Sequence, residues 1–315
     1  MLMKKNILLY MAAVAGLVLV GCNKEPQALQ GGSLNMSVQA SVGEMTKVAY
    51  DGAKTTFTQD DALTLFAWTG NDKAVAEELV VNGVVNTLDK DGKWIPATQM
   101  LWKNAREEHY FFAVFPAKKV LSFVADPYTL NANIQDPADY TANDILVATE
   151  LTGLKPTPDL TPAPVSLQFS HLMAKLNVNL KFRSQWTEPP TVSSVAVLAK
   201  KEYTVDYLTK AVTPSGEAAQ VALQPLTTPA ESYALSFSGL QVPQEGVTVM
   251  TIMINNTPYV FTAAVPIKLE SGKVTTLGII VGRENLELAS VVVTDWGTDT
   301  NTYTEGEAEI PPVQE

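Results

Sequence analysis

The sequence is nearly without the residues on which most enzyme active sites are built. Its 315 residues include two histidines, His109 and His171, and one cysteine, Cys22. Zinc sites need clusters of histidine and cysteine, and none is present. The chain also has no Gly-x-Ser-x-Gly nucleophile motif and no phosphate-binding Gly-x-x-x-x-Gly-Lys loop. We therefore expect no enzymatic activity, no metal and no cofactor.

Positive charge is also scarce. The chain has 22 lysines and arginines against 33 acidic residues, a formal net charge of −11. An acidic surface repels phosphate backbones, so nucleic acid is excluded as the expected partner. With one cysteine there is no intramolecular disulfide, and stability must come from buried apolar area and from backbone hydrogen bonds.

The N-terminus has the features of an export signal. Lys4 and Lys5 precede an uncharged run, Asn6–Val20, that is shorter than the roughly 20 apolar residues of a membrane-spanning helix. The sequence Leu-Val-Gly21-Cys22 resembles the bacterial lipobox, in which the chain is cut between Gly21 and Cys22 and the cysteine is acylated with palmitate or similar chains. An ordinary signal peptide with a chance cysteine is the alternative. We expect residues 1–21 to be a lipoprotein signal peptide and Cys22 to hold the mature protein on a membrane.

The mature chain reads as short strands separated by turns. Apolar residues alternate with polar ones in Leu34–Ala40 and Val165–Phe169, while Tyr110–Phe115 is a continuous aromatic run that Pro116 ends. Helical periodicity is scarce. Many short strands with turn residues between them predict an all-β protein made of sandwiches.

Proline marks the predicted domain boundary. Residues 152–164 contain four prolines, and neither a helix nor an inner strand persists through such spacing. We therefore expect a tether at 22–33, an N-terminal β-sandwich at 34–164 and a C-terminal β-sandwich at 165–296. An acidic tail without periodicity follows at 297–315.

The remaining polar candidates each have a structural alternative. His171, between two strand-like runs, is either a metal ligand or base, or a strand-edge histidine that bonds backbone and orients the domain junction; we favour the second. His109 fits a solvated turn before a strand. Asp60-Asp61 and Asp89-x-Asp91-Gly92 could be weak cation sites, but both are typical turns, and Lys93 stands where a third oxygen ligand would be expected.

Five tryptophans are the residues best suited to stack on sugars. Four of them border apolar strands and are expected in cores: Trp68, Trp94, Trp102 and Trp296. Trp186 has the most polar neighbours. It is the candidate for an exposed contact with a host or bacterial surface glycan or protein.

Several segments together resemble the fimbrillin-like proteins, the subunits of type V pili on anaerobic Gram-negative bacteria. The similarity runs from about residue 34 to Trp296 and depends on the order and spacing of the segments. These are Phe57–Trp68, Trp102 with Tyr110–Pro116, Asp144–Ala148, Val165–Leu180, Gly272–Val281 and Val291–Trp296.

This resemblance implies two transthyretin-like β-sandwich domains in tandem and no catalysis. It also implies a lipoprotein at the cell outer membrane, exposed at the surface and part of a fimbrium. In that family a trypsin-like protease removes the first strand after a basic residue, and the groove left behind accepts a strand from a neighbouring pilus subunit. Here the first strand would be Leu34–Ala40, and the candidate processing site is Lys47; a plain surface lysine in a loop is the alternative.

The tail bears on which role the subunit has. Residues 297–315 carry Asp299, Glu305, Glu307 and Glu309 and few apolar positions, a poor insert for an apolar groove. This favours a tip or anchor subunit, active in adhesion or attachment, over a stalk subunit. The alternative function, from a different class, is a monomeric surface glycan-binding lipoprotein.

Overall fold

The computed structural model describes residues 34–43, 56–74, 76, 78–132, 137–156 and 162–296. The predicted signal peptide, Gly21, Cys22, Lys47 and the acidic tail lie outside these residues. Within them the only helix is a short 3₁₀ turn, η1 (Pro137–Ala142), and none has the length and apolarity that crossing a bilayer requires. The prediction of an all-β fold with two tandem β-sandwich units is confirmed.

The first sheet has seven strands in the spatial order β1-β8-β7-β5-β2-β3-β4. They are β1 (Val38–Val42), β2 (Ala62–Thr69), β3 (Glu78–Leu88), β4 (Trp94–Pro96), β5 (His109–Phe115), β7 (Leu146–Leu154) and β8 (Val165–His171). β1 pairs with β8 in parallel, while every other neighbouring pair is antiparallel. β1 and β4 are the two edges of this sheet.

The second sheet has nine strands, eight of them in the order β14-β13-β10-β11-β12-β9-β15-β16. They are β9 (Ala174–Phe182), β10 (Val192–Asp206), β11 (Ala211–Pro225), β12 (Leu235–Gln241), β13 (Gln244–Ile254), β14 (Thr257–Leu269), β15 (Lys273–Val281) and β16 (Leu286–Asp295). The ninth, β6 (Asp126–Thr129), comes from the earlier part of the chain and pairs with the end of β10.

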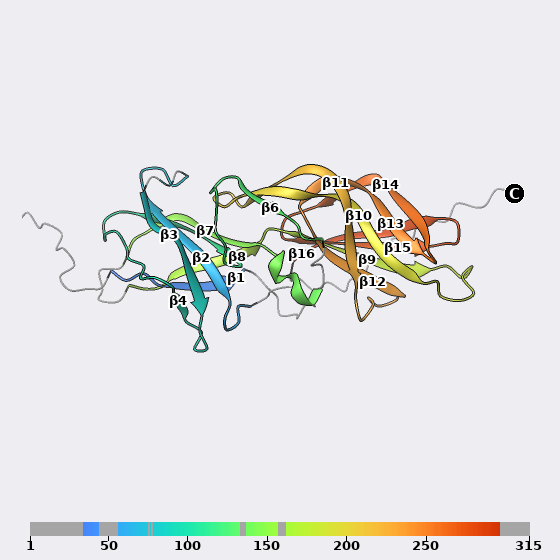
Figure 1. The fold of residues 1–315 in the computed structure, drawn as a ribbon, viewed down its shortest axis with the longest axis horizontal. Helices are drawn as coiled ribbons and strands as arrows, with labels where there is room; N and C mark the ends of the chain where they lie inside the picture. Colours follow the sequence, from blue (N-terminus) through green and yellow to red (C-terminus); the bar gives the residue numbers. More distant parts are fainter. Residues whose placement is uncertain are drawn as a thin grey trace, which may run out of the picture.

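The two sheets lie end to end along the long axis of the molecule (Figure 1). The chain passes from the first sheet to the second between β8 and β9, at Leu172-Met173, and not within the proline-rich residues 152–164. The domain ranges expected from the sequence stay a prediction. The strands of the two sheets are not separated in the sequence, because β6 pairs in the second sheet while β7 and β8, which follow it, pair in the first.

Burial explains why the central strands read as continuous apolar runs. One face of β2 and β5, with Leu65 and Phe111, packs into a smaller core that also holds Val38 of β1. The opposite face, with Phe66 and Phe112, joins a larger core shared with the second sheet. A strand buried on both faces has no need for alternating polar residues, as the aromatic sequence of β5 illustrates.

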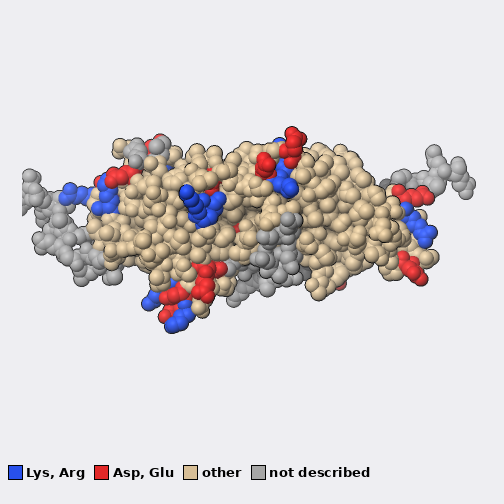
Figure 2. Space-filling model, viewed as in Figure 1, with Lys and Arg blue, Asp and Glu red and all other residues tan. Residues whose placement is uncertain are grey.

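Charged side chains are spread in small mixed groups. On the face drawn in Figure 2, lysine and arginine lie beside aspartate and glutamate, and most of the described surface there carries neither. No basic patch forms on that part of the described surface. This agrees with the acidic composition.

Candidate functional site

The first strand is held at the edge of its sheet by two short stretches of chain. Residues 38–42 pair only with β8, with Val38 opposite Val165 and Val42 opposite Phe169. Upstream, the backbone N–H of Met36 donates to the Met100 carbonyl at 2.9 Å, and Trp102 N–H donates to the Leu34 carbonyl at 2.9 Å. The sequence placed this strand at Leu34–Ala40, so the strand exists but begins four residues later.

Alternate side chains of this stretch enter the smaller core. Met36 and Val38 are 3% and 5% exposed, and Leu34, Ala40 and Val42 pack against the same cluster. The residues between them, Asn35, Ser37, Gln39 and Ser41, are exposed. The period of two seen in the sequence therefore corresponds to one inward and one outward face.

We call the surface that receives these side chains the β1 groove. It is formed by Met100, Trp102, Val165, Leu167 and Phe169, all of them buried. Burying one side chain of the size of Val or Met contributes roughly 1.5–3 kcal/mol. Removing β1 would therefore expose an apolar groove and leave the outer edge of β8 without its pairing strand, two deficits that another strand corrects together.

A cavity of about 640 Å³ lies where β1 ends. It lies between Gly43, directly after β1, and Gly272, directly before β15, and it is also lined by Phe169, His171, Lys210 and Trp296. Gly43 N–H donates to the Phe169 carbonyl at 2.7 Å, and Gly272 N–H donates to the Met173 carbonyl at 3.0 Å. We call this cavity the junction pocket, because residues of both sheets line it.

His171 occupies the wall of the junction pocket as a buried structural residue. Its Nδ1 lies 2.9 Å from both carboxylate oxygens of the buried Asp144, and its ring stacks on Trp296 with centroids 4.5 Å apart. The predicted place at the junction is right, but the partner of the ring is a carboxylate and not the backbone. His171 Nε2 and the Trp296 indole N–H have no hydrogen-bond partner among the described residues.

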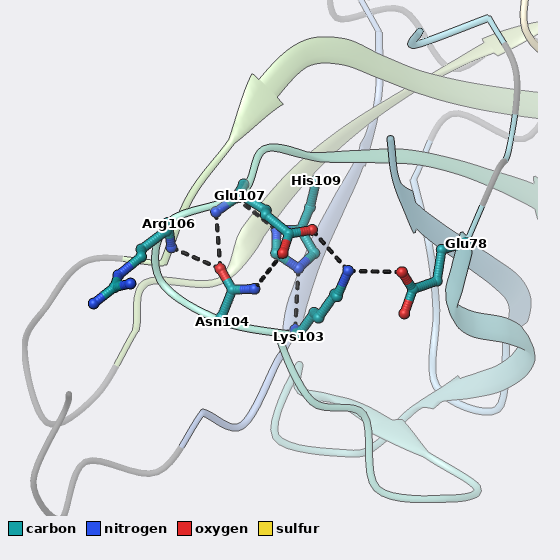
Figure 3. A network of polar contacts seen from close by, with 6 residues as sticks. All are labelled: Glu78, Lys103, Asn104, Arg106, Glu107 and His109. Atoms are coloured by element: carbon teal, nitrogen blue, oxygen red, sulfur yellow. Dashed lines mark hydrogen bonds and ion pairs between the residues drawn. The ribbon is translucent and has the colours of Figure 1, made fainter. Parts of the chain in front are cut away.

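The expectation for His109 was wrong, because the residue is fully buried and not in a solvated turn. Lys103 N–H donates to its Nε2 at 3.1 Å, so Nδ1 carries the proton and donates to the Glu107 carbonyl at 3.1 Å (Figure 3). Burial lowers the pKa of His109. Both ring nitrogens are occupied, which leaves no free nitrogen for base chemistry.

The loop around His109 is closed by charges at the surface. Lys103 forms ion pairs with Glu78 at 2.6 Å and Glu107 at 2.8 Å, and Asn104 accepts the N–H groups of Arg106 and Glu107 at 2.8 Å each (Figure 3). The ion pairs raise the pKa of Lys103 and lower that of Glu107. Exposed pairs of this kind contribute little to stability, so the loop is held mainly by its backbone caps.

The acidic pairs are turns, as the sequence predicted. The Asp89 carboxylate accepts the N–H of Asp91 and of Lys93, and Gly92 takes a φ of 77° that favours glycine. At the other pair, Asp61 accepts the Thr58 N–H. Among the described residues no group of three or more His, Cys, Asp or Glu side chains could hold a metal ion.

The four tryptophans expected in cores are found there, whereas Trp186 packs partly against the larger core. Trp68, Trp94, Trp102 and Trp296 are all buried. Trp186 is half-buried: its indole N–H donates to the Val281 carbonyl at 3.1 Å, and the Arg283 guanidinium lies 5.7 Å from its ring. A contact made by Trp186 with another molecule stays a prediction.

The fold and the β1 groove together define a tandem β-sandwich protein whose first strand is an edge held by one neighbour. This chain belongs to the fimbrillin-like family, whose sequence profile matches residues 46–296. The resemblance inferred from the sequence is confirmed.

Solved structures of similar fold include proteins of several Bacteroides species. A Bacteroides ovatus protein described as a candidate cell adhesion protein has a TM-score of 0.64 at 15% identity, covering 85% of this chain and 100% of that one. A Bacteroides uniformis protein with the same description has a TM-score of 0.60 at 15% identity, covering 83% and 98%. A Bacteroides vulgatus fimbrial protein has a TM-score of 0.51 at 10% identity, covering 83% and 100%. At these identities the likeness concerns the fold alone. No curated protein matched the chain.

Proposed function

We propose that this protein is a non-enzymatic lipoprotein subunit of a type V pilus that accepts a strand of a neighbouring subunit in its β1 groove. The observation that carries the proposal is β1 itself. It is an edge strand with one pairing partner, its inward residues fill an apolar groove, and its sequence contains no proline or charge that would oppose replacement by another strand.

The route to the open groove is cleavage after Lys47. This residue lies outside the described residues, in the sequence between Gly43 and Thr56, which are described. A cut there would separate β1 from the rest of the chain, so that only backbone pairing and side-chain packing would hold it. Export and attachment to the outer membrane would depend on cleavage between Gly21 and Cys22 and on acylation of Cys22.

The position at an end of the pilus follows from the acidic tail. A subunit that accepts a strand but has a poor strand to donate can occupy only an end of a fibre. We therefore assign a tip role to the cut protein, with other pilus subunits as partners; a protein that stays uncut would keep β1 and the lipid on Cys22 and would instead serve as an anchor. For the alternative, a monomeric glycan binder, an exposed aromatic platform would be needed, and the four buried tryptophans weigh against it.

Limited trypsin digestion of the mature protein tests this proposal. We expect a cut after Lys47, identified by N-terminal sequencing, followed by exchange of the released strand for an added fluorescent copy of residues 34–47. In a chain that carries Lys54→Gln, adding Lys47→Gln should prevent both steps, while the matched control with Lys54→Gln alone should not. If Lys47 is protected from trypsin, or if the cut protein keeps its own strand, the proposal that the β1 groove accepts another subunit's strand would be contradicted. Detergent-resistant ladders from the cut protein alone would indicate a stalk subunit instead.

A further inference from the structure

We propose that the junction pocket selects the incoming strand by binding a carboxylate one residue beyond its last contact in the β1 groove, with Lys210 as the cation. This inference rests on the proposed function, because it names the chemistry of the strand that the groove accepts. It concerns Lys210 and Trp296, which the strand-exchange proposal does not use.

The position of the pocket is the first argument. β1 and β15 both run parallel to the continuous chain of β8 and β9, and the pocket lies between the end of β1 and the start of β15. A strand that replaces β1 in the same direction reaches Gly43 and then meets Ser271-Gly272. Its next residue must therefore leave the sheet through the junction pocket.

Lys210 is the second argument. It lies in the turn between β10 and β11, with a φ of 60°, and lines both the junction pocket and an adjoining cavity of about 310 Å³. Its side chain is half-buried and has no ion-pair partner within 4.0 Å among the described residues. Burial lowers the pKa of Lys210, as expected for an ammonium group that has lost water without gaining a carboxylate.

The other charges of the pocket are already paired. Among the lining residues, Asp295 forms an ion pair with Lys273, and His171 is bonded to the buried Asp144 carboxylate, which is not itself part of the lining. In the adjoining cavity the Glu150 carboxylate accepts the N–H and hydroxyl of Thr152. In the junction pocket Lys210 is thus the described lining residue whose charge lacks an ion-pair partner, and a carboxylate is the ligand that would supply one.

A buried orphan nitrogen in the same wall supports a polar occupant. Trp296 is 5% exposed, and its indole N–H, a donor, has no hydrogen-bond partner among the described residues. Buried polar atoms without partners are rare in folded proteins, and each calls for an explanation such as a missing ligand or water. An acidic group in the pocket would satisfy Lys210 and bring an acceptor to this wall.

The sequence of the chain matches this chemistry. The residue that follows Gly43 in the sequence is Glu44, which is acidic and lies outside the described residues. We therefore expect a strand from another subunit to need an acidic side chain, or its own terminal carboxylate, at the same position.

The test uses the full mature chain with residues 48–54 replaced by the recognition site of a sequence-specific protease, so that it does not depend on cleavage at Lys47. After cutting, fluorescent N-acetylated peptides compete with the resident strand. Three are compared: residues 34–44 as a C-terminal amide, the same amide with Glu44→Gln, and residues 34–43 as a free acid. Uptake is measured by fluorescence anisotropy after gel filtration.

We expect the Glu44→Gln peptide to bind roughly five-fold more weakly than the peptide that keeps Glu44, the size of effect that a half-exposed charge pair supports. Lys210→Gln should abolish that difference, while Lys210→Arg and the exposed-site control Lys119→Gln should preserve it. Strong binding of the free acid would mean that a strand terminus also supplies the carboxylate. Equal binding of the two amide peptides, or a difference that persists in Lys210→Gln, would overturn the pocket proposal. Failure of all three peptides to enter would instead overturn strand acceptance itself.

Discussion

At the scale of single residues, the two histidines show how the fold gives the same side chain two different environments. His109 is neutral, buried and bonded to backbone on both sides, whereas His171 faces a buried carboxylate and stacks on an indole. Neither has the exposed, partnered geometry of a general base. Each makes a stability contribution that can be measured separately.

The first prediction concerns the pH dependence that His109 introduces. The pKa of His109 in the folded state lies below the ordinary value of 6.5. As the pH falls below about 6.5, His109 is therefore protonated in the unfolded chain while it stays neutral in the folded chain. The stabilisation is therefore complete above that pH and declines below it. We expect the difference in free energy of unfolding between the parent and His109→Gln to shrink between pH 7 and pH 5, measured by urea titration. A difference that stays constant over this range would contradict the assignment.

A second prediction concerns the pair of His171 and Asp144. Replacing His171 by Phe keeps a ring against Trp296 but leaves the buried Asp144 carboxylate without its donor, which costs roughly 2 kcal/mol. The double variant His171→Phe with Asp144→Leu removes both partners and should recover most of that loss. Urea denaturation of the parent, the two single variants and the double variant gives the coupling directly. Additive effects would mean that the two side chains do not depend on one another.

At the scale of elements, the edge strands of the two sheets differ in how readily they could pair with another strand. β4 is three residues long and ends in Pro96, and β14 contains Pro258 and Pro266, so both are poor templates for another strand. β1 contains neither proline nor charge. It is also the only parallel partner in the first sheet, joined to the rest through β8 alone. β1 is therefore the edge strand of that sheet whose sequence least opposes replacement by another strand.

We therefore expect β1 to open locally before the sheet unfolds. Its amides should exchange with deuterium faster than those of β5, which pairs on both sides. Val38→Ala removes two buried methyl groups at a cost of about 2 kcal/mol and should speed exchange in β1 while leaving β5 unchanged. The matched control is Gln39→Ala on the exposed face, which should change neither. Equal protection of β1 and β5 in the parent would contradict this ranking.

Local pattern is enough to find most strands, because alternation and aromatic runs reflect burial within one element. It fails for the β10–β11 hairpin. The pattern predicts strands at Val192–Ala199 and Val221–Leu223, but the strands extend to Asp206 and from Ala211. The added residues are polar or exposed along one side and are held by pairing with each other and with β6, which a local pattern does not record.

The site was predictable to a similar degree. The alternation of Leu34–Ala40 revealed the edge strand, but the junction pocket requires Gly43, Lys210 and Trp296 to meet, and they are distant in sequence. The burial of His109 was missed for the same reason. Its sequence neighbours Arg106, Glu107 and Glu108 are charged, which suggests exposure. The side chains that cover its ring are brought there by folding, and one of them is Trp102, whose ring centroid lies 4.9 Å away.

At the scale of the whole molecule, the two sheets share one core. The end of the β10–β11 hairpin lies beside the first sheet, where the Tyr207 ring stacks on Phe112 with centroids 4.9 Å apart. The hydroxyl of Tyr207 donates to the buried Asp126 at 2.6 Å, and its carbonyl accepts the Thr149 hydroxyl at 2.7 Å. Burial raises the pKa of Tyr207, which keeps this hydroxyl a donor. A load applied to one sheet would therefore be transmitted to the other through packed side chains.

The last prediction follows from this continuity. The parent should unfold in one calorimetric transition, because the larger core spans both sheets. Tyr207→Phe removes only the hydroxyl and should lower the free energy of unfolding by about 1–2 kcal/mol without changing the number of transitions. Tyr207→Ala also removes the ring between the sheets, a loss of about 3–5 kcal/mol, and should split the unfolding into two transitions. The control Tyr259→Phe loses a peripheral hydrogen bond to the Arg283 carbonyl and should behave as the parent. Two transitions in the parent would mean that the sheets unfold independently, and one transition in Tyr207→Ala would mean that they are coupled elsewhere than at Tyr207.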